Sequence, residues 1–383
     1  MKFFGKTKEA TEDLAALTRK VATDIASPDA AIAKSAVTKH YDQLVAEQKK
    51  RVPLATQAPE LKYNQVSWLA PHNSYASTYP LSGKLENQFN YYYAQQLFSL
   101  EQLLNIGCRV LDLDTHENTE GLFEKEGYKK GEVYHAHQNL ILDRLLRGKL
   151  TPPRTFTSSL EMIKRFLEEN PQEIVTLTFE NYVEANKFDQ TVLSVPGLEK
   201  FILKPEDWNP QKQNGWPTLG WMVKNNKRLV LFMETGEETK VARKISDQFV
   251  ATGYGTLDVK KLVGTLLLGP SKEQPKFLFA AVLTTSEPVP TIPSGTFLQQ
   301  AQYIINHLNE IQKNTDFQEI NSSLLEQFIE DLKKKYGRLP NFIALDHVEV
   351  GNGFKIVDRI NEQSIKDKEF RDTWLGQFQV VEK

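Results

Sequence analysis

Histidines and carboxylates follow several short apolar runs of the 383-residue sequence, at the points where those runs end. His72 and Asn73 follow the first run, Asp112 and Asp114 end the second, and His135 ends the third. The same and later runs end with further polar side chains: His137, Glu180, Glu234 and Asp346. Side chains at the carboxyl ends of strands form the active sites of β/α barrels, so these residues are candidates for one site.

Two of the carboxylates, Asp112 and Asp114, should lie on one face of a strand, because side chains alternate between faces. With Asn73 and Glu180 they supply three carboxylates and an amide oxygen. Oxygen ligands of this kind suit Ca²⁺ or Mg²⁺ better than zinc. Without a cation, three converging carboxylates would repel one another and at least one would take up a proton. We therefore expect these four residues to hold Ca²⁺, with Mg²⁺ as an alternative.

Two histidines at the ends of separate strands suit acid/base exchange, in which one accepts a proton while the other donates. His72 and His135 fit this role because each stands beside other candidate residues. For His137, support of the site and simple packing are equally open. Ordinary packing is expected for three further histidines: His116, His307 and His347.

Apolar runs alternate with amphipathic helical patterns from about residue 62 onward, which predicts parallel β/α units. Strands are expected at residues 66–70, 108–114, 133–135, 174–180, 228–233, 277–283 and 342–346. Helices are expected at residues 94–105, 160–169, 239–252, 297–313 and 324–335. So many units predict an α/β fold, a distorted TIM barrel over residues 61–383, with one strand missed or an irregular closure. Helical periodicity over residues 1–60 predicts an N-terminal helical extension.

The composition is that of an ordinary globular protein, with 40% hydrophobic and 25% charged residues and a net charge of −2 at pH 7. No nucleic-acid partner is expected, because such proteins usually carry a basic stripe. Neither a transmembrane stretch nor a signal-peptide core is evident, which predicts a cytoplasmic location or unconventional export. Lipid contact or simple packing is open both for the tyrosines at 91–93 and for the tryptophans of a loop-rich insert at 204–226.

Five segments resemble, in order and in expected secondary structure, the X-region of phosphatidylinositol-specific phospholipase C. They are PHNSY at residues 71–75, GCRVLDLD at 107–114, VYHAH at 133–137, FLEENPQEIVTLTFEN at 166–181 and PNFIALD at 340–346. The resemblance implies a distorted TIM barrel that cleaves phosphatidylinositol to diacylglycerol and a cyclic inositol phosphate at a membrane surface. It also implies two catalytic histidines, carried over onto His72 and His135, with Asp112 sharing the role of base.

The resemblance further distinguishes two subtypes. The calcium-dependent enzymes have acidic residues at the positions of Asp112 and Asp114, and the metal-independent bacterial enzymes carry a basic side chain at the latter. The chain is similar to the calcium-dependent subtype, although the animal enzymes usually have glutamate in place of Asp112. Glu234 aligns with a lysine by which the animal enzymes hold extra inositol phosphates, and because a carboxylate would repel those phosphates, an unphosphorylated head group is expected. Asp346 is expected to orient one histidine.

Three other functions remain open on the sequence. A glycerophosphodiester phosphodiesterase or sphingomyelinase D-like enzyme would use a similar barrel, but such enzymes usually show His-Arg where this chain has His72-Asn73. A non-catalytic lipid-binding barrel would be indicated by loss of a histidine or metal ligand. An interaction protein would work through the helices of residues 1–60.

Overall fold

The computed structural model describes residues 28–77, 95–136, 140, 143, 154–209, 213, 215–244, 280–283 and 317–376. Its strands form two sheets. The smaller sheet has the order β1-β8-β7, with β1 at Trp68–Pro71, β8 at Phe342–Leu345 and β7 at Ala280–Leu283. The larger sheet has the order β3-β2-β4-β5-β6, with β3 at Val133–Tyr134, β2 at Val110–Glu117, β4 at Val175–Asn181, β5 at Leu229–Met233 and β6 at Arg243–Lys244.

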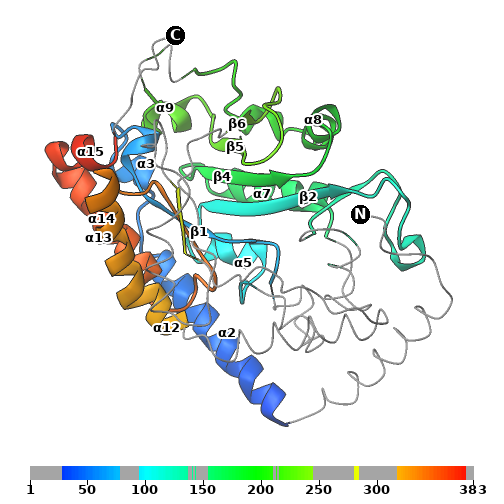
Figure 1. Ribbon diagram of the computed structural model, residues 1–383, viewed down its shortest axis with the longest axis horizontal. Coiled ribbons are helices and arrows are strands. Elements are labelled where there is room, and N and C mark those ends of the chain that lie inside the picture. Colours follow the sequence, from blue (N-terminus) through cyan, green and yellow to red (C-terminus); the bar gives the residue numbers. More distant parts are fainter. Residues whose placement is uncertain are drawn as a thin grey trace.

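The two sheets meet where β1 ends beside β2. The backbone amide of Ser74 donates to the carbonyl oxygen of Asp112 (2.8 Å), and the amide of Asp112 donates to the Ser74 hydroxyl (3.0 Å). Figure 1 shows β2, β4, β5 and β6 one above another, with β1 beneath them. The parallel strands therefore follow the order β7, β8, β1, β2, β4, β5, β6, although those in the described part of the chain do not close into a barrel.

Two expectations about the elements were wrong. The strand expected at residues 133–135 pairs antiparallel with the end of β2, as a hairpin, and is no member of the parallel series. Residues 239–244 of the helix expected at 239–252 are not helical and end in β6, which pairs with β5, and residues 245–252 lie outside the described part of the chain. The backbone amide of Thr239 donates to the carbonyl oxygen of Ala242 (3.0 Å), which closes a turn before β6, and pairing with β5 then fixes Arg243 and Lys244 as a strand. The helix expected at 297–313 lies outside the described residues.

Helix ends follow the capping residues. Ser99 accepts from the amide of Gln102 and so starts α5 at Leu100, later than expected. Thr155 caps α7, which ends before Asn170 as expected.

The α-helices of the described residues are α2 (Pro28–Gln48), α3 (Leu54–Gln57), α5 (Leu100–Asn105), α7 (Phe156–Glu169), α8 (Ala185–Leu193), α9 (Leu219–Lys224), α12 (Phe317–Glu319), α13 (Leu325–Tyr336), α14 (Gly353–Lys366) and α15 (Lys368–Trp374). Three short segments are 3-10 helices, η1 (Tyr63–Gln65), η2 (Glu124–Glu126) and η3 (Glu199–Phe201), and η4 (Ile320–Leu324) is a π-helix.

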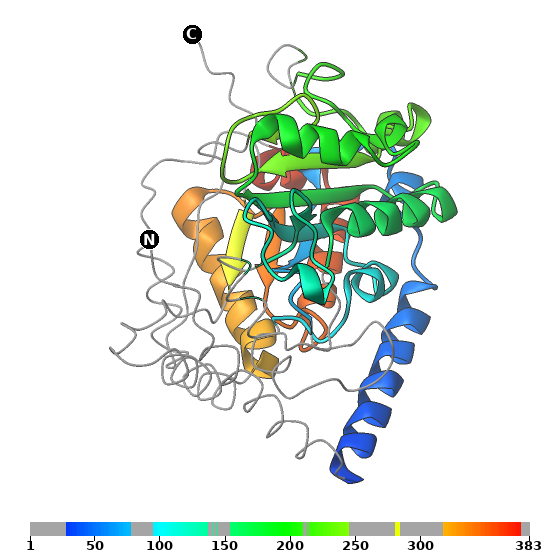
Figure 2. The same cartoon turned by 90° about the vertical axis from the view of Figure 1, so that its right-hand side faces the viewer.

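Residues 28–60 are the described part of the N-terminal extension, and α2 is its long helix. Its Tyr41 packs edge-on against Phe98 (5.2 Å between ring centroids), and His40 lies 2.8 Å from the carbonyl oxygen of Glu349. In Figure 2, α2 (blue) stands on one side of the strands and α13 (orange) on the other. None of the helices that can be described has the length and apolarity needed to cross a bilayer.

Tryptophans of the insert pack against the protein. Trp216 is buried against Tyr63 (5.2 Å) and Phe232 (5.8 Å), and Trp208 packs on Trp221 (4.8 Å). Packing is therefore the better account of these three side chains. The tyrosines at 91–93 lie outside the described residues.

Candidate active site

The register of β1 against β8 places His72 beside Asp346. Pro71 is paired with Leu345, so the residue after each strand lies at the same edge of the sheet. The His72 Nδ1 atom donates to the Asp346 carboxylate (2.9 Å), and 17% of the His72 side chain is exposed. Burial lowers the pKa of His72, but the bond to Asp346 and the charges of Asp346, Asp112 and Asp114 outweigh it and raise the pKa to about 9.

The carboxylates of β2 and β4 lie at the same edge. Asp114 is paired with Glu180 in the parallel register, and the Asp112 carboxylate accepts from the Thr178 hydroxyl (3.0 Å). Burial, followed by the charges of Asp112 and Glu180, raises the pKa of Asp114 well above its usual range. Burial and the charge of Asp112 also raise the pKa of Glu180. These carboxylates crowd one another, which is what a cation would relieve.

Asn73 joins the histidine to the carboxylates. It has a left-handed backbone (φ 45°), and its amide N–H donates to the Asp112 carboxylate (3.3 Å). Its side-chain oxygen accepts from the Tyr75 hydroxyl (3.3 Å), which also has a hydrogen bond with Asp114. Tyr75 and Thr178 were missed on the sequence. Tyr75 stands inside the segment PHNSY, and Thr178 shares a strand face with Glu180, so period two could have found it.

A hard cation fits the chemistry of these donors. The oxygens that the sequence predicts as its ligands belong to Asn73, Asp112, Asp114 and Glu180. In the described ranges, however, no group of three His, Cys, Asp or Glu side chains is already arranged to hold a metal ion. Binding would therefore require side-chain rotation, and the gain would come from relieving carboxylate repulsion.

His135 is fully buried and both of its ring nitrogens have partners. Nδ1 lies 2.9 Å from the carbonyl oxygen of Asp114, and Nε2 lies 3.0 Å from the hydroxyl of Ser159 in α7. The ring stacks on Tyr75 (5.5 Å, 20°), which connects it to the carboxylates. In this position the imidazole links the backbone of β2, at Asp114, to Ser159 of α7. To donate a proton to a substrate, Nε2 would have to leave Ser159.

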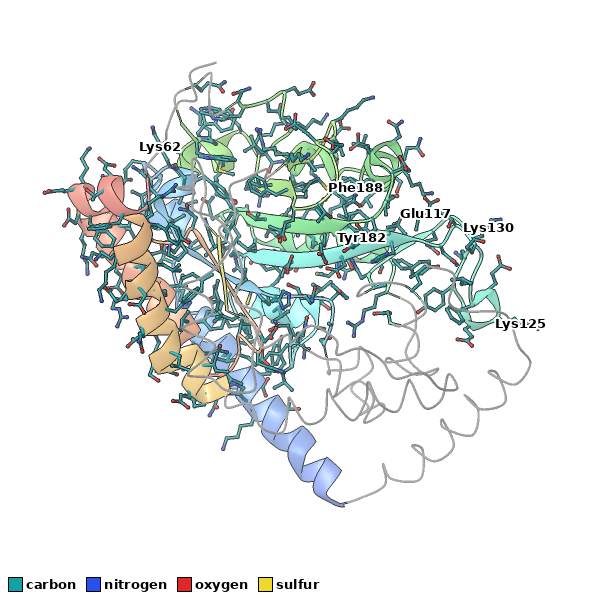
Figure 3. The ribbon with its side chains drawn as sticks, viewed as in Figure 1. Lys62, Glu117, Lys125, Lys130, Tyr182 and Phe188 are labelled. Atoms are coloured by element: carbon teal, nitrogen blue, oxygen red, sulfur yellow. The ribbon has the colours of Figure 1, made fainter. Side chains whose placement is uncertain are left out.

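Of the remaining candidate residues, one lies with the carboxylates and one lies outside the described residues. Glu234 belongs to the group: its carboxyl bonds to Thr178, and desolvation and the charge of Asp112 raise its pKa, although solvent at this exposed side chain screens part of the effect. His137 lies outside the described residues. His116 stacks on Tyr182 (4.4 Å, 12°), which is 53% exposed and lies near the ends of β2 and β4 (Figure 3).

These pKa shifts predict how stability depends on pH without a cation. For Asp114, Glu180 and His72 the folded-state pKa is raised, so each contributes most below its unfolded pKa and loses that contribution as pH rises through the folded value. The Tm in chelator should therefore fall as pH rises from about 4, near the unfolded pKa of the two carboxyls, to about 9, the folded pKa of His72. Excess Ca²⁺ should flatten this fall, since it takes the place of the protons. If calorimetry shows that Tm falls with pH equally steeply with and without Ca²⁺, this result would argue against a cation at these carboxylates.

The sequence profile of the PI-PLC X family matches residues 60–282, more than half of the chain. The chain therefore belongs to the PI-PLC X family. It is 27% identical over 317 residues to a PI-PLC X domain-containing protein of Arabidopsis thaliana, covering 79% of this chain and 63% of that protein. It is 25% identical over 202 residues to PI-PLC X domain-containing protein 1 of Arthroderma benhamiae, a match that covers 51% of this chain and 56% of that protein. The chain thus spans less than two thirds of either relative.

Among solved structures, a phosphatidylinositol-specific phospholipase C of S. aureus matches 78% of this chain and 93% of its own, with 12% identity and a TM-score of 0.45. At this TM-score the likeness carries no argument about the fold, the reaction or the residues.

Proposed function

We propose that the chain is a calcium-dependent phosphoric diester hydrolase that cleaves phosphatidylinositol into diacylglycerol and a cyclic inositol phosphate, on a distorted TIM barrel and at a membrane surface. The observation that carries the proposal is the His72–Asp346 pair, 2.9 Å apart, at the same edge as Asp112, Asp114 and Glu180. A charged imidazole beside carboxylates suits transfer of a phosphoryl group, because that reaction needs both proton movement and charge stabilisation.

In the proposed reaction the inositol 2-hydroxyl attacks the adjacent phosphorus and the bond from phosphorus to the glycerol oxygen breaks. Asp112 accepts the hydroxyl proton, and His72, oriented by Asp346, stabilises charge on the phosphoryl oxygens. His135 supplies the proton to the glycerol oxygen after exchanging its Ser159 partner. Ca²⁺, or Mg²⁺ in its place, would lower the pKa of the attacking hydroxyl and neutralise phosphoryl charge.

The direct test is incubation with phosphatidylinositol vesicles labelled in the inositol ring, with Ca²⁺ or with a chelator, following soluble inositol phosphate. We expect cyclic inositol phosphate and diacylglycerol with Ca²⁺ and loss of turnover in chelator, restored by added Ca²⁺. Full activity in chelator would overturn the cation. A phosphorylated lipid as product would instead indicate a sphingomyelinase D-like or glycerophosphodiester reaction, and Mg²⁺ in a parallel arm tests the choice of metal.

The partners of His135 favour a second candidate, a non-catalytic barrel that binds a phospholipid head group. Both ring nitrogens are already bonded and the side chain has no exposed surface. In that case vesicle binding would persist with no product in either Ca²⁺ or Mg²⁺. The same assay, with a sedimentation arm for vesicle binding, separates the two candidates.

A further inference from the structure

A buried amide side chain, Gln96, joins the two strand ends that carry His72 and Asp346. Its Nε2 atom donates to the carbonyl oxygens of His72 (2.8 Å) and Leu345 (2.9 Å), and its Oε1 atom accepts from the amide of Val348 (3.2 Å). The residue has no exposed surface. This one side chain therefore holds the end of β1 against the end of β8, directly beside His72 and Asp346.

A second buried amide side chain, that of Asn321, binds the backbone that follows β8, at Asp346 and His347. Its Nδ2 atom donates to the carbonyl oxygens of Asp346 (2.9 Å) and His347 (2.9 Å). Asn321 lies in the π-helix η4, and a Cβ atom on Gly351 would stand 2.8 Å from its own Cβ. Departures from α-helical geometry of this kind are frequent at functional sites.

Backbone strain is an independent observation at the same place. Asn73 (φ 45°) and His347 (φ 50°) are two of four non-glycine residues with positive φ in the described residues, and each directly follows one member of the pair. Such conformations persist where the surroundings over-determine them, and they cluster at active sites. The hydrogen bonds of Gln96 and Asn321 are the surroundings that could supply this restraint.

We propose that Gln96 and Asn321 are positioning residues that hold His72 and Asp346 in register for the reaction. The inference rests on the proposed function for its kinetic consequence, while the restraint itself is a property of the folded protein. Neither residue touches the reacting atoms. Each acts through the backbone of the pair, so a loss should appear in turnover and not in substrate binding.

The chain offers a matched control at the opposite ends of the same strands. Asn341 is also fully buried, and its Nδ2 atom donates to the carbonyl oxygens of Asn64 (2.8 Å) and Val66 (3.2 Å), just before β1. Asn341→Leu removes the same kind of bridge between the same two strands, far from the pair. Its effect on Tm measures the structural cost alone.

The experiment compares Gln96→Met and Asn321→Leu with Asn341→Leu in the full chain. We expect Gln96→Met to lower kcat on phosphatidylinositol vesicles by about 10- to 100-fold with KM changed less than about twofold, because small misplacements of a catalytic group are costly. Asn341→Leu should lower Tm comparably and keep kcat. The low-field proton NMR signal of the His72–Asp346 bond, assigned by its loss in His72→Asn, should shift or broaden in the first two variants only.

The NMR signal is measured without substrate, so it separates the two hypotheses. If the wild-type protein turns over no lipid, the proposed function fails while the signal still decides the restraint. An unchanged signal in both Gln96→Met and Asn321→Leu, or a kcat no lower than that of Asn341→Leu, would overturn the positioning role. Should Gln96→Met not fold, Asn321→Leu against Asn341→Leu makes the same comparison.

Discussion

Replacing His72 by alanine should lower turnover of phosphatidylinositol by about 10²–10³-fold, the usual cost of losing one group that stabilises charge in the transition state. The physical reason is the charged imidazole held at 2.9 Å from Asp346, with a pKa raised to about 9, beside Asp112. Initial rates on labelled vesicles with Ca²⁺ measure this loss. Tm should fall as well, because the charged pair with Asp346 contributes to stability, so the rates are compared at a temperature at which the variant is folded.

A double-variant cycle tests whether the pair acts as a unit. Asp346→Asn should also slow turnover, and His72→Ala combined with Asp346→Asn should be no slower than His72→Ala alone, because groups that act together are not additive. His40→Ala is the control, since this histidine of α2 contacts the carbonyl oxygen of Glu349 and not the site. Near-normal turnover of His72→Ala would refute the assignment.

Replacing Phe179 by alanine should lower the free energy of unfolding by about 3–5 kcal/mol, as expected for a large side chain lost from a packed core. Phe179 of β4 has no exposed surface. Its ring packs edge-on against Phe156 of α7 (5.4 Å between ring centroids) and Phe188 of α8 (5.0 Å between ring centroids). These rings fix two helices on the strand that carries Glu180. Denaturant unfolding followed by circular dichroism gives the value.

Leu193→Ala is the control for this core variant, because Leu193 ends α8 with 40% of its surface exposed. It should change the free energy of unfolding by no more than about 0.5 kcal/mol. A loss below about 1 kcal/mol for Phe179→Ala would mean that the helices do not depend on this contact.

Much of the fold could be predicted because its signals are local. The strands at 66–70, 174–180 and 342–346 were found within a few residues, since each is a short apolar run bounded by turn residues. The errors also have local causes that pattern reading overlooked. At residues 243–244 pairing with β5 overrides the helical pattern of the sequence. For residues 133–135, apolar character predicted a strand but carries no information about its direction.

By itself the sequence determined which chemistry the chain carries: a histidine and an asparagine after one strand, and two carboxylates on one face of another. The sequence also predicted that Asp346 orients one histidine, and only the tertiary structure decided that this histidine is His72. His72 and Asp346 lie 274 residues apart and meet because β1 pairs with β8, and Gln96 holds them from a segment with no catalytic pattern. His135 likewise faces Ser159 because α7 packs against β3, the strand that precedes His135. Such partners depend on strand order and helix packing, which period and spacing along one chain do not encode.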